Sequence, residues 1–224
     1  IERLLFLLKY GIAYVKEEKE VDGVIESRDE KHIMRYQQMF AALTVREKIK
    51  NGVTSGVIWH TQGSGKTALS YYLNYVLTDF LATQNKVAKF YFIVDRLDLM
   101  EQAKQEFEAR GLEVKTADTR AELMSQFRNN QSLEGKSGNH EITVVNIQRF
   151  AEDKEKVNLP AYATNLQRIF IVDEAHRGYT LDKELSDDEL LYRNQEDYIS
   201  KYRTVIEYFD AVKVALTATP ALHT

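Results

Sequence analysis

The residues with the clearest chemical signal form the run His60-Thr61-Gln62-Gly63-Ser64-Gly65-Lys66-Thr67. Glycines at this spacing let the backbone curl so that successive N–H groups point inward at a polyphosphate. We therefore expect this loop to bind ATP, with Lys66 reaching the β- and γ-phosphates and the Thr67 hydroxyl binding Mg²⁺. The full pattern has glycine where His60 stands, which leaves a merely flexible glycine loop as the alternative.

A pair of carboxylates follows the apolar run Ile169 to Val172, in the sequence Asp173-Glu174-Ala175-His176. At the carboxyl edge of a parallel sheet, Asp173 is suited to hold the Mg²⁺ of the nucleotide and Glu174 to polarise the attacking water. Alone, the pair could simply begin a helix with acidic residues. Its distance from Lys66, 173 − 66 = 107 residues, leaves room for several strand-and-helix units between the two motifs.

A third, weaker candidate is Leu216-Thr217-Ala218-Thr219-Pro220, where a strand pattern runs into small hydroxylated residues. The hydroxyls of Thr217 and Thr219 could lie beside the Asp173 to His176 loop and sense whether the γ-phosphate is present. A plain strand that ends in a turn before proline is the alternative.

These motifs lie in a chain that alternates short apolar runs with longer helical patterns. Continuously apolar runs such as Phe90 to Val94 indicate strands buried on both faces, as in a parallel sheet between helix layers. We expect a doubly wound α/β fold with strands at 53–59, 89–94, 113–116, 142–146, 168–172 and 213–216. The expected helices cover about 35–50, 66–82, 97–110, 119–128 and 196–210, and the polar stretches 129–140 and 178–195 are expected to be loops.

Composition sets limits on the class of protein. The 224 residues include 30 Lys and Arg against 34 Asp and Glu, a net charge of −4, so any DNA binding must come from a local basic strip. The chain has no cysteine, which excludes disulfides and thiolate zinc sites and fits a cytoplasmic location. The histidines do not show metal-ligand spacing, and no apolar run approaches the roughly 18 residues that a membrane-spanning helix needs.

The first 33 residues have a different character from the rest. Leu4, Leu5, Leu8 and Ile12 have helical spacing, and charges of both signs follow. We expect residues 1–33 to form a helical arm and residues 34–224 to form one nucleotide-binding domain. Since the chain starts at Ile1 and stops just after the third motif, we expect it to be a fragment of a longer protein.

In this order, the three motifs resemble those of the first RecA-like domain of superfamily 2 helicases and translocases of the DEAH type. The resemblance covers about Met34 to Thr224. It implies that Arg35-Tyr36-Gln37-Gln38 is the family's Q motif and that Gln38, rather than Gln37, contacts adenine. It also implies a coupling role for His176, Thr217 and Thr219.

Four segments of the sequence are similar, more specifically, to the motor subunit of type I restriction enzymes. The resemblance rests on the string Trp59 to Thr67, on Val94-Asp95-Arg96, on Thr143 to Phe150 and on Asp173 to Arg177. It implies a nuclease domain before the arm, a second RecA-like domain after the chain, and modification and specificity subunits as partners. It also implies double-stranded DNA along Arg96, Thr143 and Gln148, which we expect to follow strands at the edge that bears the phosphate loop. Alternatively, Arg96 pairs with a carboxylate and Thr143 only begins a strand.

The leading hypothesis is therefore an ATP-driven translocase of double-stranded DNA within a restriction endonuclease subunit. Another superfamily 2 helicase or a remodeller is the alternative within the enzymes. A nucleotide-switched assembly module without turnover is the alternative of a different class, and the intact Glu174 argues against it.

Overall fold

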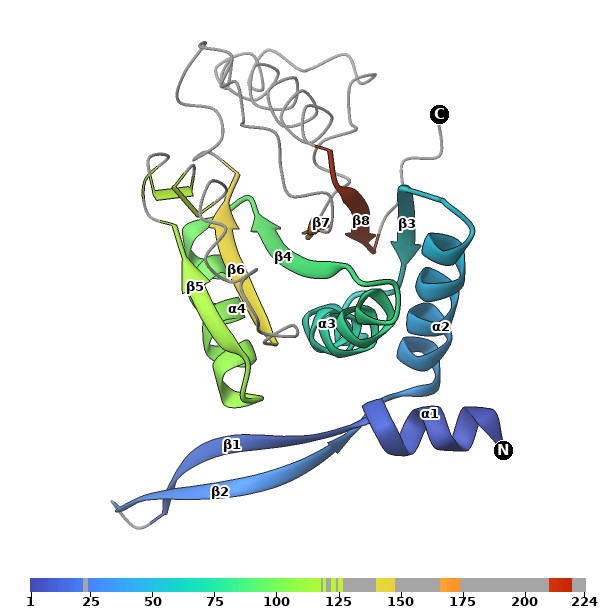
Figure 1. The fold of residues 1–224 in the computed structure, drawn as a ribbon. Coiled ribbons are helices and arrows are strands. Elements are labelled where there is room, and N and C mark those ends of the chain that lie inside the picture. The colour runs from blue at the N-terminus through green and yellow to red at the C-terminus, as the bar shows by residue number, and fades with distance from the viewer. Residues whose placement is uncertain are drawn as a thin grey trace, which may run out of the picture.

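The computed structural model describes residues 1–21, 24–117, 119, 122–123, 125–126, 140–147, 166–173 and 210–218. Helix α1 (Glu2–Tyr10) and a two-stranded hairpin, β1 (Ile12–Val21) and β2 (Val24–Ile33), precede a six-stranded sheet with its helices. Figure 1 shows the hairpin projecting from the base of the molecule, away from the sheet. The chain is thus an α/β body with an N-terminal helix and hairpin.

The six-stranded sheet is parallel at every pairing. Its order is β3-β8-β7-β4-β6-β5, formed by β3 (Ser55–Trp59), β4 (Val87–Val94), β5 (Glu113–Thr116), β6 (Glu141–Asn146), β7 (Leu166–Val172) and β8 (Val212–Thr217). Because all strands run the same way, their carboxyl ends share one edge of the sheet. The segments after β3, β7 and β8 therefore lie at that edge, on three neighbouring strands.

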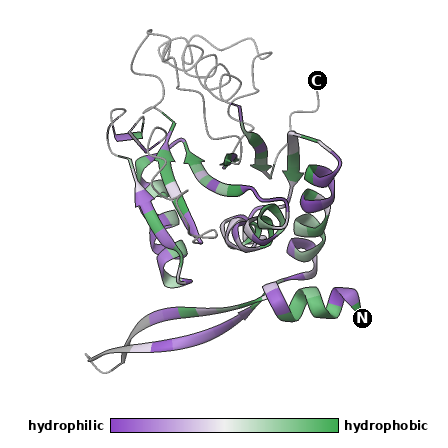
Figure 2. Cartoon of the chain, viewed as in Figure 1, coloured by the Kyte–Doolittle hydropathy of each residue, from purple (hydrophilic) through white to green (hydrophobic). Residues whose placement is uncertain are grey.

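Three helices pack beside this sheet: α2 (Tyr36–Lys50), α3 (Lys66–Ala82) and α4 (Leu97–Ala109). Helix α3 contacts β4, α2 and α4, and it contributes the fully buried Leu69, Leu73 and Leu77. In β4 and β7 the apolar residues are buried on both faces, and Figure 2 shows the sheet strands as largely hydrophobic and the hairpin as largely hydrophilic. Within the described part of the chain, no helix is long and apolar enough to cross a membrane.

The expected doubly wound α/β fold is confirmed, and each of its six predicted strands is present within three residues of the expected bounds. Helices α2, α3 and α4 also match the predicted ranges. Of the helix expected at 119–128, residues 122–123 and 125–126 are helical. The helix expected at 196–210 and the loops expected at 129–140 and 178–195 lie outside the described residues, apart from His140 and Asp210.

The expectation of a helical arm over residues 1–33 is wrong beyond Tyr10, because β1 and β2 form an antiparallel hairpin. Its pattern has a period of two residues: Ala13 and Val15 are buried, and Tyr14 between them is exposed. Opposite charges also face each other across the strands, as in the pair Lys16 and Asp29. The dipeptide Asp22-Gly23 is a hairpin signal in the sequence that a helical interpretation of the arm overlooks.

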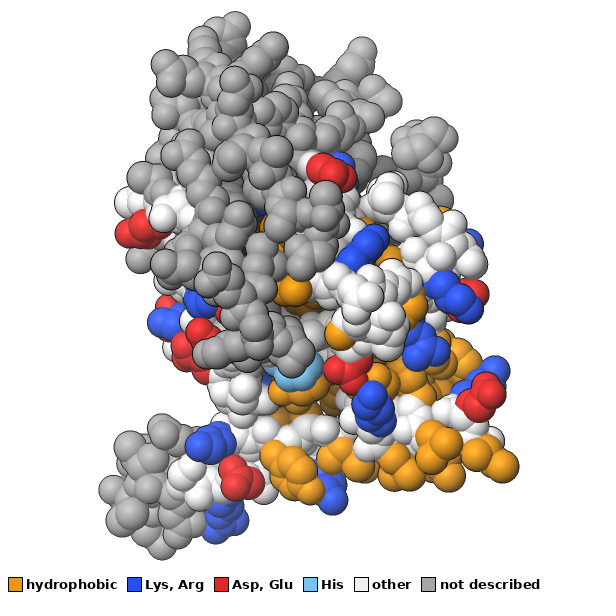
Figure 3. Space-filling model, viewed as in Figure 1, with side chains coloured by type: hydrophobic (Ala, Val, Ile, Leu, Met, Phe, Trp, Pro, Cys, Tyr) orange, Lys and Arg blue, Asp and Glu red, His pale blue; other side chains and the backbone are white. Residues whose placement is uncertain are grey.

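The helix of the arm is packed on the body. Phe6 is buried, and the Tyr10 hydroxyl donates a hydrogen bond of 3.0 Å to Oδ2 of Asp79 on α3. The Lys9 ammonium lies 2.7 Å from the same carboxylate. Leu4, Leu5 and Leu8 of α1 are exposed. Figure 3 shows a row of hydrophobic side chains along the base of the molecule, where Figure 1 places α1.

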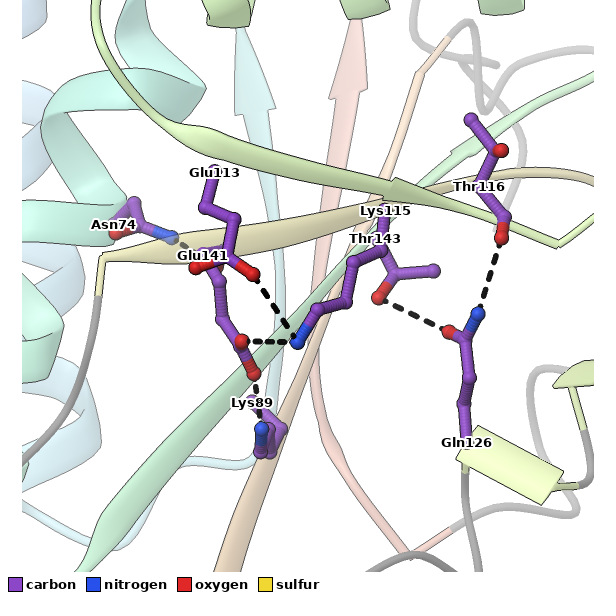
Figure 4. A network of polar contacts seen from close by, with 8 residues as sticks. All are labelled: Asn74, Lys89, Glu113, Lys115, Thr116, Gln126, Glu141 and Thr143. Carbon is purple, nitrogen blue, oxygen red and sulfur yellow. Dashed lines mark hydrogen bonds and ion pairs between the residues drawn. The ribbon is translucent and has the colours of Figure 1, made fainter. Parts of the chain in front are cut away.

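A polar network holds the amino-terminal end of the sheet together (Figure 4). The Glu141 carboxylate at the start of β6 pairs with Lys89 of β4 and with Lys115 of β5, the latter at 2.5 Å. The Asn74 side chain of α3 donates a hydrogen bond of 2.9 Å to the Glu141 carbonyl. Burial alone would raise the pKa of Glu141, but the hydrogen bonds from Lys115 and Lys89 outweigh it and lower that pKa. The network therefore joins three strands and a helix at the end of the sheet opposite the phosphate loop.

This network predicts a pH-dependent contribution to stability. Replacing Glu141→Gln leaves two lysines without their buried partner, so we expect a loss of about 3 kcal/mol in the free energy of unfolding near neutral pH. A lowered pKa in the folded state means that the contribution is complete above the ordinary value of 4.5 and is lost as pH falls through the folded value. Urea unfolding of both proteins along a pH series should show the difference shrinking on the acid side.

Glu113→Gln is the matched control, since its carboxylate lies 3.6 Å from the same Lys115. Its side chain is 58% exposed, against 11% for Glu141, so we expect a loss below about 1 kcal/mol. Equal effects of the two substitutions, or a Glu141→Gln effect that does not change with pH, would contradict the assignment.

Candidate nucleotide-binding site

The loop between β3 and α3 has the backbone shape that the sequence predicts for phosphate binding. Gly63 and Gly65 have φ angles of +73° and +79°, in the left-handed region that favours glycine. A bond of 3.2 Å from the Ser64 N–H to the Thr61 carbonyl closes the turn. Gly65 is the N-cap of α3, so the first N–H groups of this helix, beginning with Lys66 and Thr67, face the loop with the positive end of the helix dipole.

Two side-chain atoms of this loop are buried and have no hydrogen-bond partner in the described structure: Ser64 Oγ and His60 Nδ1. Buried polar atoms in folded proteins are nearly always hydrogen-bonded, so this pair marks a place where a polar ligand fits. Burial lowers the pKa of His60, and the positive charge of Lys66 lowers it further. The imidazole is therefore neutral near neutral pH and offers one donor and one acceptor nitrogen.

Gln38 holds this loop from the side of α2. Its Nε2 donates to the Gly65 carbonyl at 2.9 Å and to the Ser64 carbonyl at 3.4 Å, and its Oε1 accepts a bond of 2.9 Å from the Arg35 N–H. The side chain is only 4% exposed. The φ angle of +79° requires glycine at position 65, and a Cβ there would also displace the Gln38 amide, since it would lie 2.8 Å from Nε2. The amide faces the loop, and its expected contact with adenine stays a prediction.

The third motif, which begins at Leu216, contacts the residues at the start of the loop. The His60 N–H donates to the carbonyl of the buried Thr217 at 3.1 Å, and the Trp59 indole donates to the Ala218 carbonyl at 3.0 Å. These two bonds fix the end of β3 to the end of β8. Sequence reasoning did not find the contact of Trp59, because it joins residues 159 positions apart.

Asp173 directly follows β7, one strand beyond β8 along the sheet. Its N–H donates to the Ile93 carbonyl of β4 at 2.9 Å. Val172, the last residue of β7, pairs with both β4 and β8, and β8 continues with β3 as far as Thr217. The end of β8 therefore lies between the loop after β3 and Asp173 at the carboxyl edge. The predicted base Glu174 and the predicted coupling residues His176 and Thr219 lie outside the described residues.

The residues expected to contact DNA lie in different surroundings. Arg96 precedes α4 and is exposed, and its guanidinium pairs with the Asp98 carboxylate at 2.5 and 3.0 Å. Hydrogen bonding to Arg96 lowers the pKa of Asp98. The carboxylate partner that the sequence analysis left open as an alternative is thus present two positions away.

The expectation that Thr143 follows a strand at this edge is wrong. It lies within β6, is buried, and its hydroxyl donates to Oε1 of Gln126 at 3.4 Å. A side chain inside a central strand cannot reach solvent, so this geometry does not place Thr143 on a DNA-facing surface. Gln148 lies outside the described residues.

A second group of possible metal ligands lies on the hairpin. Ligand atoms of Glu17, Glu30 and His32 are within 4.8 Å of one another, a spatial grouping that sequence spacing did not indicate. His32 Nε2 lies 3.8 Å from the Glu30 carboxylate. This ion pair accounts for the proximity of two of the three side chains without a metal.

Relatives of the chain come from restriction systems. The family profile described as type III restriction enzyme, res subunit, matches residues 31–222. The type I restriction enzyme EcoKI endonuclease subunit of Escherichia coli (strain K12) is 34% identical over 206 residues, which are 85% of this chain and 16% of that subunit. The SauCOLORF180P endonuclease subunit of Staphylococcus aureus (strain COL) is 34% identical over 149 residues, 65% of this chain and 14% of its own length.

Solved structures share the fold. The ATP-dependent type ISP restriction-modification enzyme LlaBIII bound to DNA superposes with a TM-score of 0.61 at 15% identity, covering 89% of this chain and 13% of that enzyme. The SWI2/SNF2 ATPase core of Sulfolobus solfataricus in complex with double-stranded DNA gives 0.51 at 15% identity, covering 83% of this chain and 32% of that core.

The phosphate loop, the parallel sheet and these similarities lead to one conclusion. The chain has the RecA-like α/β fold and belongs to the restriction-enzyme family described as type III restriction enzyme, res subunit.

Proposed function

We propose that this chain is the first ATP-binding domain of a restriction endonuclease subunit that moves along double-stranded DNA. The observation that carries the proposal is the loop at 60–65, which precedes α3 and has two left-handed glycines. Its buried Ser64 Oγ and His60 Nδ1 have no hydrogen-bond partner among the described residues. A polyphosphate satisfies these atoms and the helix N-terminus together.

The residues around the loop have separate roles in ATP binding and hydrolysis. Backbone N–H groups between Thr61 and Thr67, other than that of Ser64, and the Lys66 ammonium bind the phosphates. The donor set fits Mg²⁺, since the Thr67 hydroxyl and the Asp173 carboxylate are oxygen ligands at the same edge of the sheet. Bound Mg²⁺ supplies positive charge against the phosphate oxygens. Glu174, next in the sequence after Asp173, accepts a proton from the attacking water.

Movement on DNA requires more than this chain, which spans 16% of the length of its Escherichia coli relative. We infer that a second RecA-like domain closes over the nucleotide and that modification and specificity subunits complete the complex in the cytoplasm. Two structural similarities support DNA as the track, since LlaBIII and the SWI2/SNF2 core were both solved with DNA. The similarity to the SWI2/SNF2 core leaves a chromatin-type remodeller as the alternative function. Cleavage of DNA by the full-length subunit would favour the restriction endonuclease over the remodeller.

Lys66→Ala should weaken the binding of Mg-ATP at least about tenfold, on the order of 1.4 kcal/mol, because the phosphates lose a fixed positive charge. Isothermal titration calorimetry measures this directly. Lys48→Ala, a lysine of α2 away from the loop, is the control and should bind like the parent. Equal affinity of the Lys66→Ala protein and the parent would contradict the assignment of the loop.

Glu174→Gln in the full-length subunit should reduce ATP turnover below about a tenth of the parent value while ATP binding persists, because an amide cannot accept the proton. Asp173→Ala should instead make nucleotide affinity insensitive to Mg²⁺. Steady-state hydrolysis and titrations with and without Mg²⁺ distinguish the two carboxylates. Normal turnover in the Glu174→Gln protein would place the base elsewhere.

Arg96→Ala in the full-length subunit should weaken the binding of unrelated duplexes about equally and lower the slope of log K against log salt by about 0.9, the value for one phosphate contact. Asp98→Asn should have the opposite effect on affinity, since it frees the guanidinium from its carboxylate partner. Fluorescence anisotropy over a salt series measures both. Unchanged DNA binding in both variants would show that Arg96 serves only its ion pair.

A further inference from the structure

His60 differs from the rest of the phosphate loop, because a large polar side chain stands where the full pattern has glycine. The turn of the loop is closed by the Ser64 N–H and the Thr61 carbonyl, and Gln38 holds the carbonyls of Ser64 and Gly65. Among the described residues, none of the hydrogen bonds that shape the loop involves the imidazole. Its Nδ1 is nevertheless buried and has no partner there, so this atom is available to a ligand.

The position of His60 relative to Lys66 indicates which part of a nucleotide meets the imidazole. Besides burial, the Lys66 charge lowers the pKa of His60, so the two side chains lie within electrostatic reach of each other. In a phosphate loop the backbone N–H groups cradle the α- and β-phosphates, whereas the lysine reaches the β- and γ-phosphates. A side chain near that lysine is therefore placed toward the terminal end of the polyphosphate.

A neutral imidazole has the donor that this position requires. With its lowered pKa, His60 is uncharged near neutral pH and carries one N–H, whose place on the ring is set by the available partner. Phosphate oxygens only accept hydrogen bonds, so a phosphate selects the tautomer with hydrogen on Nδ1. Because the ring is neutral, it donates this bond without repelling Lys66. Glycine at the same position would offer no side-chain donor.

The backbone of His60 holds the imidazole in place before a nucleotide binds. Its N–H donates to the carbonyl of Thr217 at 3.1 Å, and Thr217 is only 2% exposed at the end of β8. Figure 1 shows β8 beside β3, the strand that ends just before His60. A donor that is positioned in advance loses little conformational freedom on binding, so its hydrogen bond contributes more to affinity.

We propose that His60 is a specificity residue of the nucleotide site, whose Nδ1–H donates to the γ-phosphate and makes the chain bind ATP in preference to ADP. This role rests on the function proposed above, because it concerns one side chain of the same site. Ser64, whose buried Oγ also has no partner among the described residues, has a different role. It lies within the part of the loop that cradles the α- and β-phosphates, which ATP and ADP share.

Calorimetric titrations of the full-length subunit with Mg-ADP and with the Mg complex of adenylyl imidodiphosphate, a non-hydrolysable ATP analogue, measure this preference. His60→Ala should weaken binding of the analogue about tenfold and leave ADP binding within about twofold of the parent, because ADP has no γ-phosphate. His60→Asn carries an amide N–H about where Nδ1 lies and should keep the preference. Ser64→Ala is the matched control and should weaken both nucleotides by the same factor.

Steady-state hydrolysis by the full-length subunit gives a second readout. In the His60→Ala protein the KM for ATP should rise while the inhibition constant of ADP stays the same, so a lower ratio of ADP to ATP should inhibit this protein by half. A parallel rise of both constants would contradict a role at the γ-phosphate.

An equal loss of affinity for both nucleotides in the His60→Ala protein would overturn the proposal, because the imidazole would then support the shape of the loop. An unchanged ratio of the two affinities, or a His60→Asn protein that behaves like His60→Ala, would overturn it as well. The Lys66→Ala protein separates this role from the site itself. If it bound both nucleotides like the parent, the site assignment and the role of His60 would both fail. If it lost both nucleotides while His60→Ala kept the parent's ratio, only the role of His60 would fail.

Discussion

The hydrogen bonds of Gln38 to the carbonyls of Ser64 and Gly65 are the contact on which the shape of the phosphate loop depends. A loop rich in glycine loses much conformational entropy when it is ordered, so it needs contacts that hold it from outside. Gln38 supplies them from α2, while its own amide is held by the Arg35 N–H. The carbonyls of Ser64 and Gly65 are occupied in this way, and the Ser64 N–H bonds to the Thr61 carbonyl, so a ligand would meet the other N–H groups of the loop.

The order of strands then decides which residues can cooperate with that loop. Strand β8 lies between β3 and β7, so the third motif is the immediate neighbour of the phosphate loop and the Asp173 motif is one strand farther away. The bonds from His60 to Thr217 and from Trp59 to Ala218 make the loop and the end of β8 one unit. Hydrogen bonds thus connect Thr217 directly to the residue at which the loop begins.

Much of this fold was predictable from sequence, because continuous apolar runs such as Ile169 to Val172 indicate buried parallel strands directly. The backbone shape of the loop at 60–65 was equally predictable, since its glycines are adjacent in the chain. The hairpin between Ile12 and Ile33 was missed although its signals are local, because the helical spacing of the leucines before it suggested a longer helix. Two other features could not be predicted in this way. The use of Gln38 depends on a loop 26 residues away, and the burial of Thr143 depends on the strands on either side of β6. Both depend on contacts between distant segments, which local patterns do not encode.

The parallel sheet brings two motifs that are 173 − 66 = 107 residues apart to one edge. Lys66 follows the loop after β3, Asp173 follows β7, and β8 lies between the two strands. The Asp173 N–H also bonds to the Ile93 carbonyl of β4, and β4 continues directly into Asp95 and Arg96. A nucleotide with its Mg²⁺ held between Lys66 and Asp173, as proposed above, would therefore bind next to the strand that leads to the proposed DNA contact. This arrangement gives a physical route from ATP to DNA within a single sheet.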